Sequence, residues 1–290
     1  MKFSVIIPTY NDWTRLKQCL DALEKQTLSR DEFEIIVVNN NKECSAPTDF
    51  NPSGKVQMVH EPTPGSYVAR NRGVEIAQGK ILAFTDSDCI PVPDWLLNAE
   101  KAYKNPKTDL IGGGIKLFRT KEGNEIAYIY ASHTAFPQHI NVPLGKGVTA
   151  NLFVKKSIFE ALGGFDPTVK SGEDWEFTTR CTQMGYKMIY DESVLILHPA
   201  SNDLASLFRK YYRLTCWAAI NIKRKFGYSQ LRILGSHLLK GLEYVNIHQS
   251  KELNSKERII IFSIDLLRYL HRAVVHTGIL LKIINPYNAR

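Results

Sequence analysis

Residues 81–89 read Ile-Leu-Ala-Phe-Thr-Asp-Ser-Asp-Cys, an apolar run that ends in two aspartates one residue apart. The apolar run predicts a buried strand, and Asp86 and Asp88 follow its carboxyl end. In open α/β sheets this end borders the crevice in which ligands bind. Two carboxylates this close repel each other unless a proton or a cation joins them, and proteins commonly hold Mg²⁺ with one or two carboxylates plus substrate phosphates. The alternative is a plain aspartate-rich turn, and the rest of the chain decides between the two.

Strands and helices alternate along the first part of the chain. Short apolar runs predict strands, and apolar stripes at helical spacing predict helices. The expected strands lie at residues 3–8, 34–38, 56–60 and 80–85, and the expected helices lie at 13–26, 67–77 and 94–103. This alternation predicts right-handed βαβ units and a largely parallel sheet, which is an α/β fold.

The pattern is more varied from residue 110 to residue 199. A strand at 110–118 carries the triplet Gly112-Gly113-Gly114, and glycines inside a strand indicate close approach of another backbone or of a ligand. Residues 120–147 look loop-rich because of their prolines and glycines. We expect further strands at 150–154 and 187–197, the latter a long strand or a pair, and helices at 157–162 and 173–185.

Basic side chains gather in the last third of the chain. The 290-residue chain has a net charge of +8, yet residues 201–290 carry 15 Lys/Arg against 5 Asp/Glu, while residues 1–200 carry 22 against 24. Helices with apolar stripes are expected there at 203–225, 229–249 and 256–284. The charge points to an anionic surface such as a membrane, or else to a solvated helical face. No recognisable nucleic-acid-binding module is present, so we expect no nucleic-acid partner.

The role of residues 201–290 stays open at this point. No uncharged run in them reaches the ~20 residues that a membrane span requires. An amphipathic helix peripheral on the inner face of a membrane, a homodimer face, and packing on the first 200 residues all fit an apolar stripe.

Cysteine usage and the first residues favour a cytoplasmic location. The five cysteines, at positions 19, 44, 89, 181 and 216, form no CxxC pair and no zinc-binding spacing. The strand-like residues 3–7 follow Met1-Lys2 directly, without the cleavage site of a secretory leader. We therefore expect a reducing compartment and free thiols. Cys89, beside the aspartate pair, is interpreted as a small buried apolar residue rather than a nucleophile.

Seven short segments occur in a fixed order along residues 3–199. They are Pro8-Thr9-Tyr10-Asn11, Val37-Val38-Asn39-Asn40-Asn41, Pro64-Gly65-Ser66-Tyr67-Val68-Ala69-Arg70-Asn71-Arg72-Gly73, Asp86-Ser87-Asp88, Gly164-Phe165-Asp166, Gly172-Glu173-Asp174 and His198-Pro199. Together they resemble the motifs of the family 2 glycosyltransferases, which depend on nucleotide-sugars and have the GT-A fold. The resemblance implies a Rossmann-like, mostly parallel sheet flanked by helices. It also implies a catalytic domain at 1–200, with a nucleotide-sugar half at about 1–110 and an acceptor half at about 111–200, followed by a basic, amphipathic helical region at 201–290.

The resemblance assigns a donor site to the first half. A helix that begins after Gly65 with Arg70 nearby favours an anion, here the donor diphosphate or ribose region. Position 39 is often an aspartate in the family, and an amide can still donate to and accept from a base. The residues expected to bind the nucleotide-sugar are Pro8, Thr9, Tyr10, Asn11, Asn39, Asn41, Gly65, Arg70, Asn71, Asp86 and Ser87.

The same resemblance implies a metal site for Mn²⁺ or Mg²⁺. Asp88 is the expected direct ligand, and Asp86 contacts ribose or binds the metal through water. His198 completes the metal shell or contacts the phosphates, with a purely structural histidine as the alternative, and a neutral imidazole suits Mn²⁺ better than Mg²⁺.

Two adjacent carboxylates at the start of the helix 173–185 are the candidates for catalysis. The resemblance favours Asp174 as the general base that takes a proton from an acceptor hydroxyl, with Glu173 as a positioning residue or the alternative base. Simple stabilisation of a helix N-terminus is the competing reading of both residues. Trp175 and Asn151 are expected to shape the acceptor pocket.

The resemblance thus implies an inverting, metal-dependent, hexosyltransferase-like enzyme that moves a sugar from a nucleotide-diphosphate sugar to an acceptor hydroxyl. A carbohydrate or lipid-linked acceptor, in polysaccharide or glycolipid synthesis at the cell envelope, is the expected partner. The alternatives are a sugar nucleotidyltransferase and a non-catalytic carbohydrate-binding protein. Against the first stands the absence of a glycine-rich basic loop after residue 8, and against the second stand the intact Asp86, Asp88 and Asp174.

Overall fold

The chain divides into two compact units, each built from two stretches of sequence. The structure is a computed structural model, and it describes residues 1–43, 46–48, 50–52, 56–226 and 253–288. The first unit comprises residues 1–117 and 136–199, and the second comprises residues 118–135 and 200–290. Residues 118–135, which the sequence assigned to the acceptor half, therefore group with the C-terminal stretch.

The first unit is built on one sheet of eight strands in the order β3-β2-β1-β4-β7-β6-β8-β5. The strands β3, β2, β1 and β4 run parallel, whereas β7 is antiparallel to both of its neighbours and β5 is antiparallel to β8. The strands are β1 (Phe3–Thr9), β2 (Phe33–Asn39), β3 (Val56–His60), β4 (Ile81–Thr85), β5 (Ile90–Pro91), β6 (Leu110–Phe118), β7 (Asn151–Lys155) and β8 (Met188–Pro199). The predicted α/β fold is confirmed, and its parallel part coincides with the nucleotide-sugar half.

Helices cover both faces of this sheet, close to the predicted positions. The expected stripe of Leu16, Cys19, Leu20 and Leu23 is buried on α1. The short β5 was not predicted, since two residues are too few for a periodic pattern. The helices are α1 (Trp13–Leu23), α2 (Ser66–Ile76), α3 (Trp95–Tyr103), α5 (Gln138–Asn141), α6 (Lys156–Ala161) and α7 (Glu173–Gln183), with 3-10 turns η1 (Arg30–Glu32) and η2 (Val142–Leu144).

Each face of the sheet has its own apolar core, because successive side chains of a strand point to opposite faces. In β1, Val5 and Ile7 pack in one core with Leu16 of α1 and with the α3 side chains. Ile6 lies between them in sequence and packs in the other core with Val74 of α2 and with side chains of α6 and α7. The carboxyl ends of β1, β2 and β4 are thereby held between two packed layers.

The close approach predicted for the glycine triplet is confirmed at Gly113. A Cβ atom there would lie 2.3 Å from Asn151 Nδ2 and 2.3 Å from the Val194 carbonyl oxygen. Any larger side chain would separate β6 from its neighbours, so the glycine is required by packing.

The prediction of a loop-rich stretch at 120–147 is wrong in part, because it contains α4 (Glu125–Thr134), α5 and η2. The Asn124 side chain caps α4 by accepting from the backbone N–H groups of Ile126 and Ala127. Glycines and prolines on both sides of this helix hid it in the sequence, although Asn124 followed by Glu125 is a helix-start pattern.

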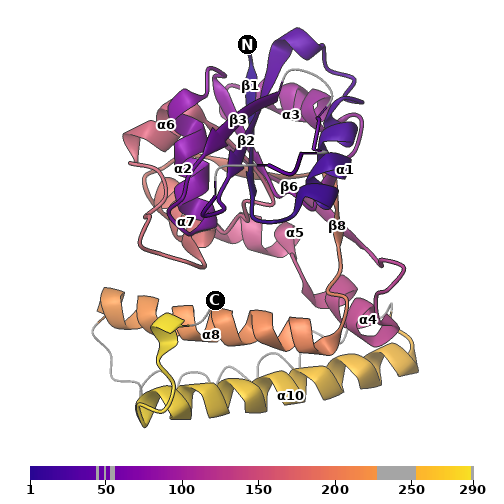
Figure 1. Cartoon of the computed structure of the whole chain (residues 1–290), viewed down its shortest axis with the longest axis vertical. Coiled ribbons are helices and arrows are strands. Elements are labelled where there is room, and N and C mark those ends of the chain that lie inside the picture. The colour runs from indigo at the N-terminus through magenta and orange to yellow at the C-terminus, as the bar shows by residue number, and fades with distance from the viewer. Residues whose placement is uncertain (44–45, 49, 53–55, 227–252, 289–290) are drawn as a thin grey trace. The chain divides into compact units, whose positions relative to one another are not determined.

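The second unit is helical in its described part. It consists of α4, α8 (Leu204–Phe226), α10 (Ser255–Leu280) and the 3-10 turn η3 (Pro286–Asn288). α8 and α10 lie side by side, and α4 packs against both (Figure 1). The helices predicted at 203–225 and 256–284 are confirmed, and the one predicted at 229–249 lies outside the described residues. Over the described ranges, no helix is both long enough and apolar enough to traverse a bilayer.

Candidate active site

Three parallel strands bring the predicted donor residues to one edge of the sheet. In β1, Thr9 is paired in register with Asn39 of β2, and Asp86 follows the end of the neighbouring β4. Pro8 and Thr9 are buried, and the Thr9 hydroxyl has no hydrogen-bond partner among the described residues. An unpaired buried hydroxyl at the end of a strand is a candidate contact for a ligand.

The asparagine triplet at the end of β2 organises the surrounding loops. Asn39 Oδ1 accepts from the Asn41 N–H at 3.0 Å, and Asn41 Oδ1 accepts from the Asn11 N–H at 2.9 Å. Asn11 has a φ of 53°, a left-handed conformation that asparagine tolerates better than most residues. Asn40 donates to the Glu61 and Thr63 carbonyls at 2.7 and 2.8 Å and accepts from the Gly65 N–H at 2.9 Å. The triplet therefore fixes both the turn after β1 and the turn before α2.

A pocket of about 420 Å³ opens beside this triplet. Tyr10, predicted to bind the donor, is 68% exposed and offers an aromatic face at this pocket. The pocket is large enough to take a nucleobase. Its lining residues are Tyr10, Asn11, Trp13, Asn41, Lys42, Glu43, Ala46 and Pro47.

Arg70 of α2 is a buried cation beside Asp86, at the predicted donor site. Its side chain is 4% exposed, and its guanidinium forms an ion pair with Asp86 and lies 5.6 Å over the Tyr67 ring. The Arg70 Nε has no hydrogen-bond partner among the described residues. A buried cation beside a carboxylate and at the first turns of a helix favours an anionic ligand. Gly65, with a φ of +145°, precedes α2 and permits the sharp entry into it.

Asp86, Asp88, Cys89 and His198 form a cluster whose ligand atoms all lie within 4.8 Å of one another. The His198 Nε2 is 3.8 Å from Asp88 Oδ1. Burial raises the pKa of the Asp88 carboxyl, the Asp86 charge raises it further, and His198 and Arg15 oppose the shift. A bound cation would relieve the burial of Asp88 beside a second carboxylate.

The orientation of His198 also fits a metal ligand. Its Nδ1 is 2.7 Å from the Pro199 carbonyl oxygen, which can only accept, so the ring donates its proton there. A neutral imidazole with a protonated Nδ1 presents a bare lone pair at Nε2, toward Asp88. The Phe136 ring, 4.8 Å away between centroids, packs on the imidazole. Two carboxylates and one imidazole therefore suit Mn²⁺ or Mg²⁺.

Cys89 is buried, as predicted, and burial raises its thiol pKa well above the ordinary value. A neutral thiol is a weak metal ligand and a poor nucleophile. Ser87 is buried next to it and donates to Asp12 at 3.4 Å, so its hydroxyl supports the start of α1.

The two predicted catalytic carboxylates have different environments, because neighbouring residues on a helix point about 100° apart. Asp174 is half-buried, and its Oδ1 accepts from the Tyr67 hydroxyl at 3.2 Å and from the Trp175 N–H at 2.9 Å. Burial raises the pKa of Asp174, against the opposing effects of the Trp175 N–H, the Arg70 charge and the Tyr67 hydroxyl. A carboxylate with a raised pKa is suited to proton abstraction.

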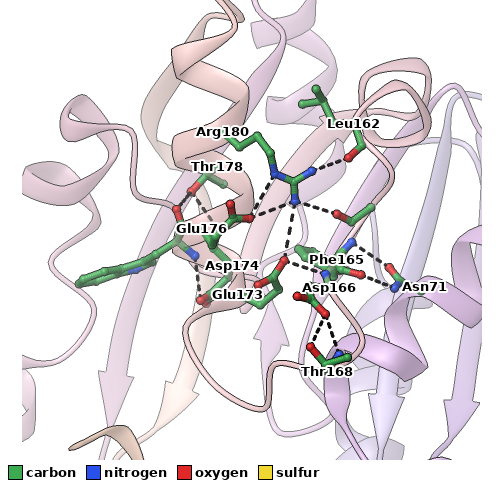
Figure 2. Close-up of polar contacts among 12 residues, drawn as sticks. Asn71, Leu162, Phe165, Asp166, Thr168, Glu173, Asp174, Glu176, Thr178 and Arg180 are labelled. Carbon is green, nitrogen blue, oxygen red and sulfur yellow. Dashed lines mark hydrogen bonds and ion pairs between the residues drawn. The ribbon is translucent and has the colours of Figure 1, made fainter. Parts of the chain in front are cut away.

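Glu173 is only 1% exposed and is engaged by the loop before α7. Its Oε1 accepts from the Asp166 N–H at 2.7 Å and lies 3.7 Å from Arg180 (Figure 2). Burial raises the pKa of Glu173 to about 7. Arg180 in turn donates to the carbonyls of Leu162 and Gly164. Of the two carboxylates, Asp174 is the more accessible, and Glu173 holds the loop.

Asn71, predicted to contact the donor, lies in the same network. Its Nδ2 donates to the Phe165 carbonyl at 2.7 Å, and its Oδ1 accepts from the Phe165 N–H at 3.1 Å (Figure 2). The amide thus ties α2 to the loop that precedes Asp174 rather than pointing to an exposed ligand site.

The predicted acceptor residues separate in the structure. Trp175 is 41% exposed, and Lys146 Nζ lies 5.3 Å above its ring, which makes a surface for a sugar or an anionic group. Asn151 is fully buried, and its amide accepts from the Trp95 indole and donates to the Gly114 and Val194 carbonyls. An acceptor contact through Asn151 would break these bonds, so its side chain serves the sheet.

Two site residues, Tyr67 and Arg15, received no role from the sequence. Tyr67 was part of a recognised segment, but only the fold brings its hydroxyl to Asp174, 107 residues away. Arg15 lies 3.4 Å from Asp88 and pairs with Asp12 at 2.8 Å. Its position one turn after Asp12 on a helix was the only sign of this pairing.

A family model and several known proteins match this chain in sequence. A model of glycosyl transferase family 2 matches residues 4–161. Glycosyltransferase AglE of Haloferax volcanii is 32% identical over 217 residues, which cover 73% of this chain and 71% of that protein. The pre-mycofactocin glycosyltransferase of Mycobacterium tuberculosis is 25% identical over 211 residues, covering 69% of this chain and 43% of that protein.

Two solved structures share the fold at low identity. The mannosyltransferase PcManGT from Pyrobaculum calidifontis, in complex with GDP-Man and Mn²⁺, has a TM-score of 0.57 at 20% identity, covering 99% of this chain and 81% of that one. TarS 1-349 of S. aureus, in complex with UDP, has a TM-score of 0.54 at 17% identity, covering 97% and 92%. The chain therefore belongs to glycosyl transferase family 2 and is a glycosyltransferase with the GT-A fold.

Proposed function

We propose that the protein is a metal-dependent, inverting glycosyltransferase that moves a sugar from a nucleotide-diphosphate sugar to an acceptor hydroxyl. One observation carries the proposal. The cluster of Asp86, Asp88 and His198 and the half-buried Asp174 are connected in one unit through Arg70 and Tyr67. A cation site and a general base joined in this way are the two parts that such a displacement requires.

In this proposal the donor nucleotide lies along the carboxyl ends of β1 and β2. Thr9, Asn39 and the pocket residues Tyr10, Asn11 and Asn41 contact the base and ribose in this proposal, and Arg70 with the start of α2 contacts the diphosphate. The neighbours in complex with UDP, UDP-GlcNAc and GDP-Man support a nucleoside diphosphate as the leaving group.

Asp86, Asp88 and His198 would hold Mn²⁺ or Mg²⁺, and the Mn²⁺ in the PcManGT complex supports this choice. Bound there, the ion would supply positive charge to the leaving diphosphate. The buried Arg70 adds a fixed positive charge beside Asp86, at no cost of reorganisation during the reaction.

Asp174 is the proposed base. Its carboxylate takes the proton of the acceptor hydroxyl while that oxygen attacks the anomeric carbon, and Tyr67 and the Trp175 N–H hold the carboxylate in place. A single displacement of this kind inverts the anomeric configuration. Glu173 keeps the loop around Asp166 in position.

The acceptor is proposed to be a carbohydrate or a lipid-linked intermediate, as in polysaccharide or glycolipid synthesis for the cell envelope. The exposed Trp175 face with Lys146 over it supports a sugar acceptor, with an anionic group as a further point of contact. The free, buried cysteines among the described residues, Cys19, Cys89, Cys181 and Cys216, support a cytoplasmic site of action.

The test is nucleotide release from UDP-, GDP-, dTDP- and CDP-sugars, with Mn²⁺ and with chelator. We expect one donor class to be used, and only with metal. The anomeric configuration of the product, read by NMR, tests inversion separately, and a retained configuration would rule out the single displacement. Full turnover in chelator would rule out the metal site.

A further inference from the structure

The exposed face of α10 is mostly apolar from residue 259 to the end of the helix. Ten side chains between residues 259 and 281 are exposed, and none of them is charged. Eight of the ten are large apolar side chains, and they define the α10 ridge. The ridge consists of Ile259, Phe262, Leu266, Leu267, Leu270, Val274, Leu280 and Leu281.

Two charged side chains in the middle of the same helix contact α4 and α8 instead. Asp265 Oδ1 accepts from the Tyr130 hydroxyl of α4 at 2.7 Å and pairs with Arg268 at 3.0 Å, while Arg268 lies 5.4 Å over the Tyr211 ring of α8. His276 is 1% exposed, and burial lowers its pKa to about 4. A helix on a water-facing surface has the opposite arrangement, with its apolar stripe inward and its charges outward.

The ridge is too large to be incidental. Phe262 is 58% exposed, Leu270 51% and Val274 68%, so the described parts of the chain leave most of each side chain uncovered. From residue 259 to residue 281 a helix rises about 33 Å. Contiguous exposed apolar surface of this extent marks an interaction site.

Charge decides which partner fits the ridge. Residues 201–290 carry a net charge of +10. Exposed basic side chains lie near both ends of the ridge, at Arg258 and Lys282, and at Lys256, which pairs with Glu125 at 3.1 Å. Two copies meeting through their ridges would bring two such basic regions together, at a cost in repulsion. An anionic lipid surface attracts the same charges and accepts the apolar side chains.

We propose that the α10 ridge is a membrane-docking surface, which lies in the interface of bilayers that contain anionic phospholipid. Basic side chains make the first, salt-sensitive contact, and the ridge then inserts between the lipid headgroups. This proposal does not rest on the transfer reaction, and its test needs neither donor nor acceptor.

The test is co-sedimentation of the full chain with vesicles of phosphatidylcholine alone or mixed with phosphatidylglycerol. Wild type should bind the mixed vesicles, more weakly as salt rises, and should ignore the neutral ones. The double variant Phe262→Gln/Leu270→Gln should lose at least about tenfold in affinity. The matched control is Met58→Gln/Met184→Gln, which changes two exposed apolar side chains of the first unit and should bind as wild type.

A second measurement does not depend on a loss of binding. Leu266→Trp adds an indole to the ridge, and Met184→Trp adds one outside it. Brominated phosphatidylglycerol vesicles should quench the added fluorescence of the first variant only.

Three results would overturn the proposal. Wild type could ignore anionic vesicles at low salt, or the added indoles could be quenched equally. Light scattering could instead show a lipid-independent dimer that Phe262→Gln/Leu270→Gln dissociates, in which case a second copy covers the ridge.

Discussion

The Tyr67 hydroxyl donates a hydrogen bond of 3.2 Å to Asp174 Oδ1, and thereby joins α2 to the proposed base at the start of α7. Such a bond stabilises the charged form of the carboxyl, so it opposes the rise in the Asp174 pKa that burial causes. Tyr67 is itself buried, and its pKa is raised by burial, so it stays a hydrogen-bond donor across the working pH range.

The first prediction concerns this pair. Asp174→Asn keeps the shape and removes the basicity, so turnover should fall by ~10²-fold or more while nucleotide binding survives. Tyr67→Phe should cause a smaller fall. Because the base must be ionised, activity is lost as the pH falls through its pKa, and loss of the Tyr67 donor should move this acidic limb of the pH profile upward. An unchanged acidic limb in Tyr67→Phe would show that Tyr67 does not influence the pKa of the base.

The second prediction concerns the metal. Asp88→Ala should abolish Mn²⁺ binding in calorimetry and should abolish turnover. When both proteins are free of metal, Asp88→Ala should be at least as stable as wild type near neutral pH, because the variant no longer buries this carboxylate beside Asp86. Asp21→Ala, which removes an exposed carboxylate on α1, is the control. Wild-type Mn²⁺ affinity in Asp88→Ala would show that the ion binds elsewhere.

The third prediction concerns Glu173, whose pKa rises from 4.5 to about 7 on burial. Between these values the folded state binds more protons than the unfolded state, so this group's contribution to stability falls as the pH rises through the window. Glu173→Gln has no carboxyl at this position, so its free energy of unfolding does not include this pH-dependent decrease. Relative to wild type, its free energy of unfolding should improve by up to about 3 kcal/mol between about pH 4.5 and pH 8.

Urea unfolding at both pH values measures this change. Glu176→Gln is the control, since Glu176 lies on the same helix turn, pairs with the same Arg180 and is 42% exposed. An equal pH dependence in both variants would mean that Glu173 is not the group responsible.

The fourth prediction concerns Asn40, which bonds three backbone groups of residues 61–65. Asn40→Ala should lower the free energy of unfolding by about 2–3 kcal/mol. It should also raise the KM for the donor, because Gly65 and the α2 turn that carries Arg70 lose their support. Asn105→Ala removes an exposed amide that accepts one backbone bond and should change neither quantity appreciably. A wild-type KM in Asn40→Ala would show that the loop at residues 61–65 does not support donor binding.

The strands that build the site could be predicted because each is an uninterrupted apolar run followed by polar residues, as in β4 and Asp86. The sequence also favoured Asp174 over Glu173, but only the helix geometry buries one and leaves the other accessible. It could not foresee that the amides of Asn71 and Asn151 would be occupied by backbone groups, since those partners are distant in sequence. α4 was missed because glycines and prolines flank it, which made residues 120–147 look like a loop.

The placement of α4 has a consequence for dividing this protein. The second unit takes residues 118–135 from the middle of the chain, so the polypeptide passes from one unit to the other three times. Tyr130 is fully buried among Leu207, Ile261 and Ile264. A chain shortened to residues 1–199 would keep α4 but strip away the helices that cover it, leaving Tyr130 and Ala127 in water. Expressing the first unit alone therefore requires replacing residues 118–135 with a polar linker, as well as cutting after Pro199.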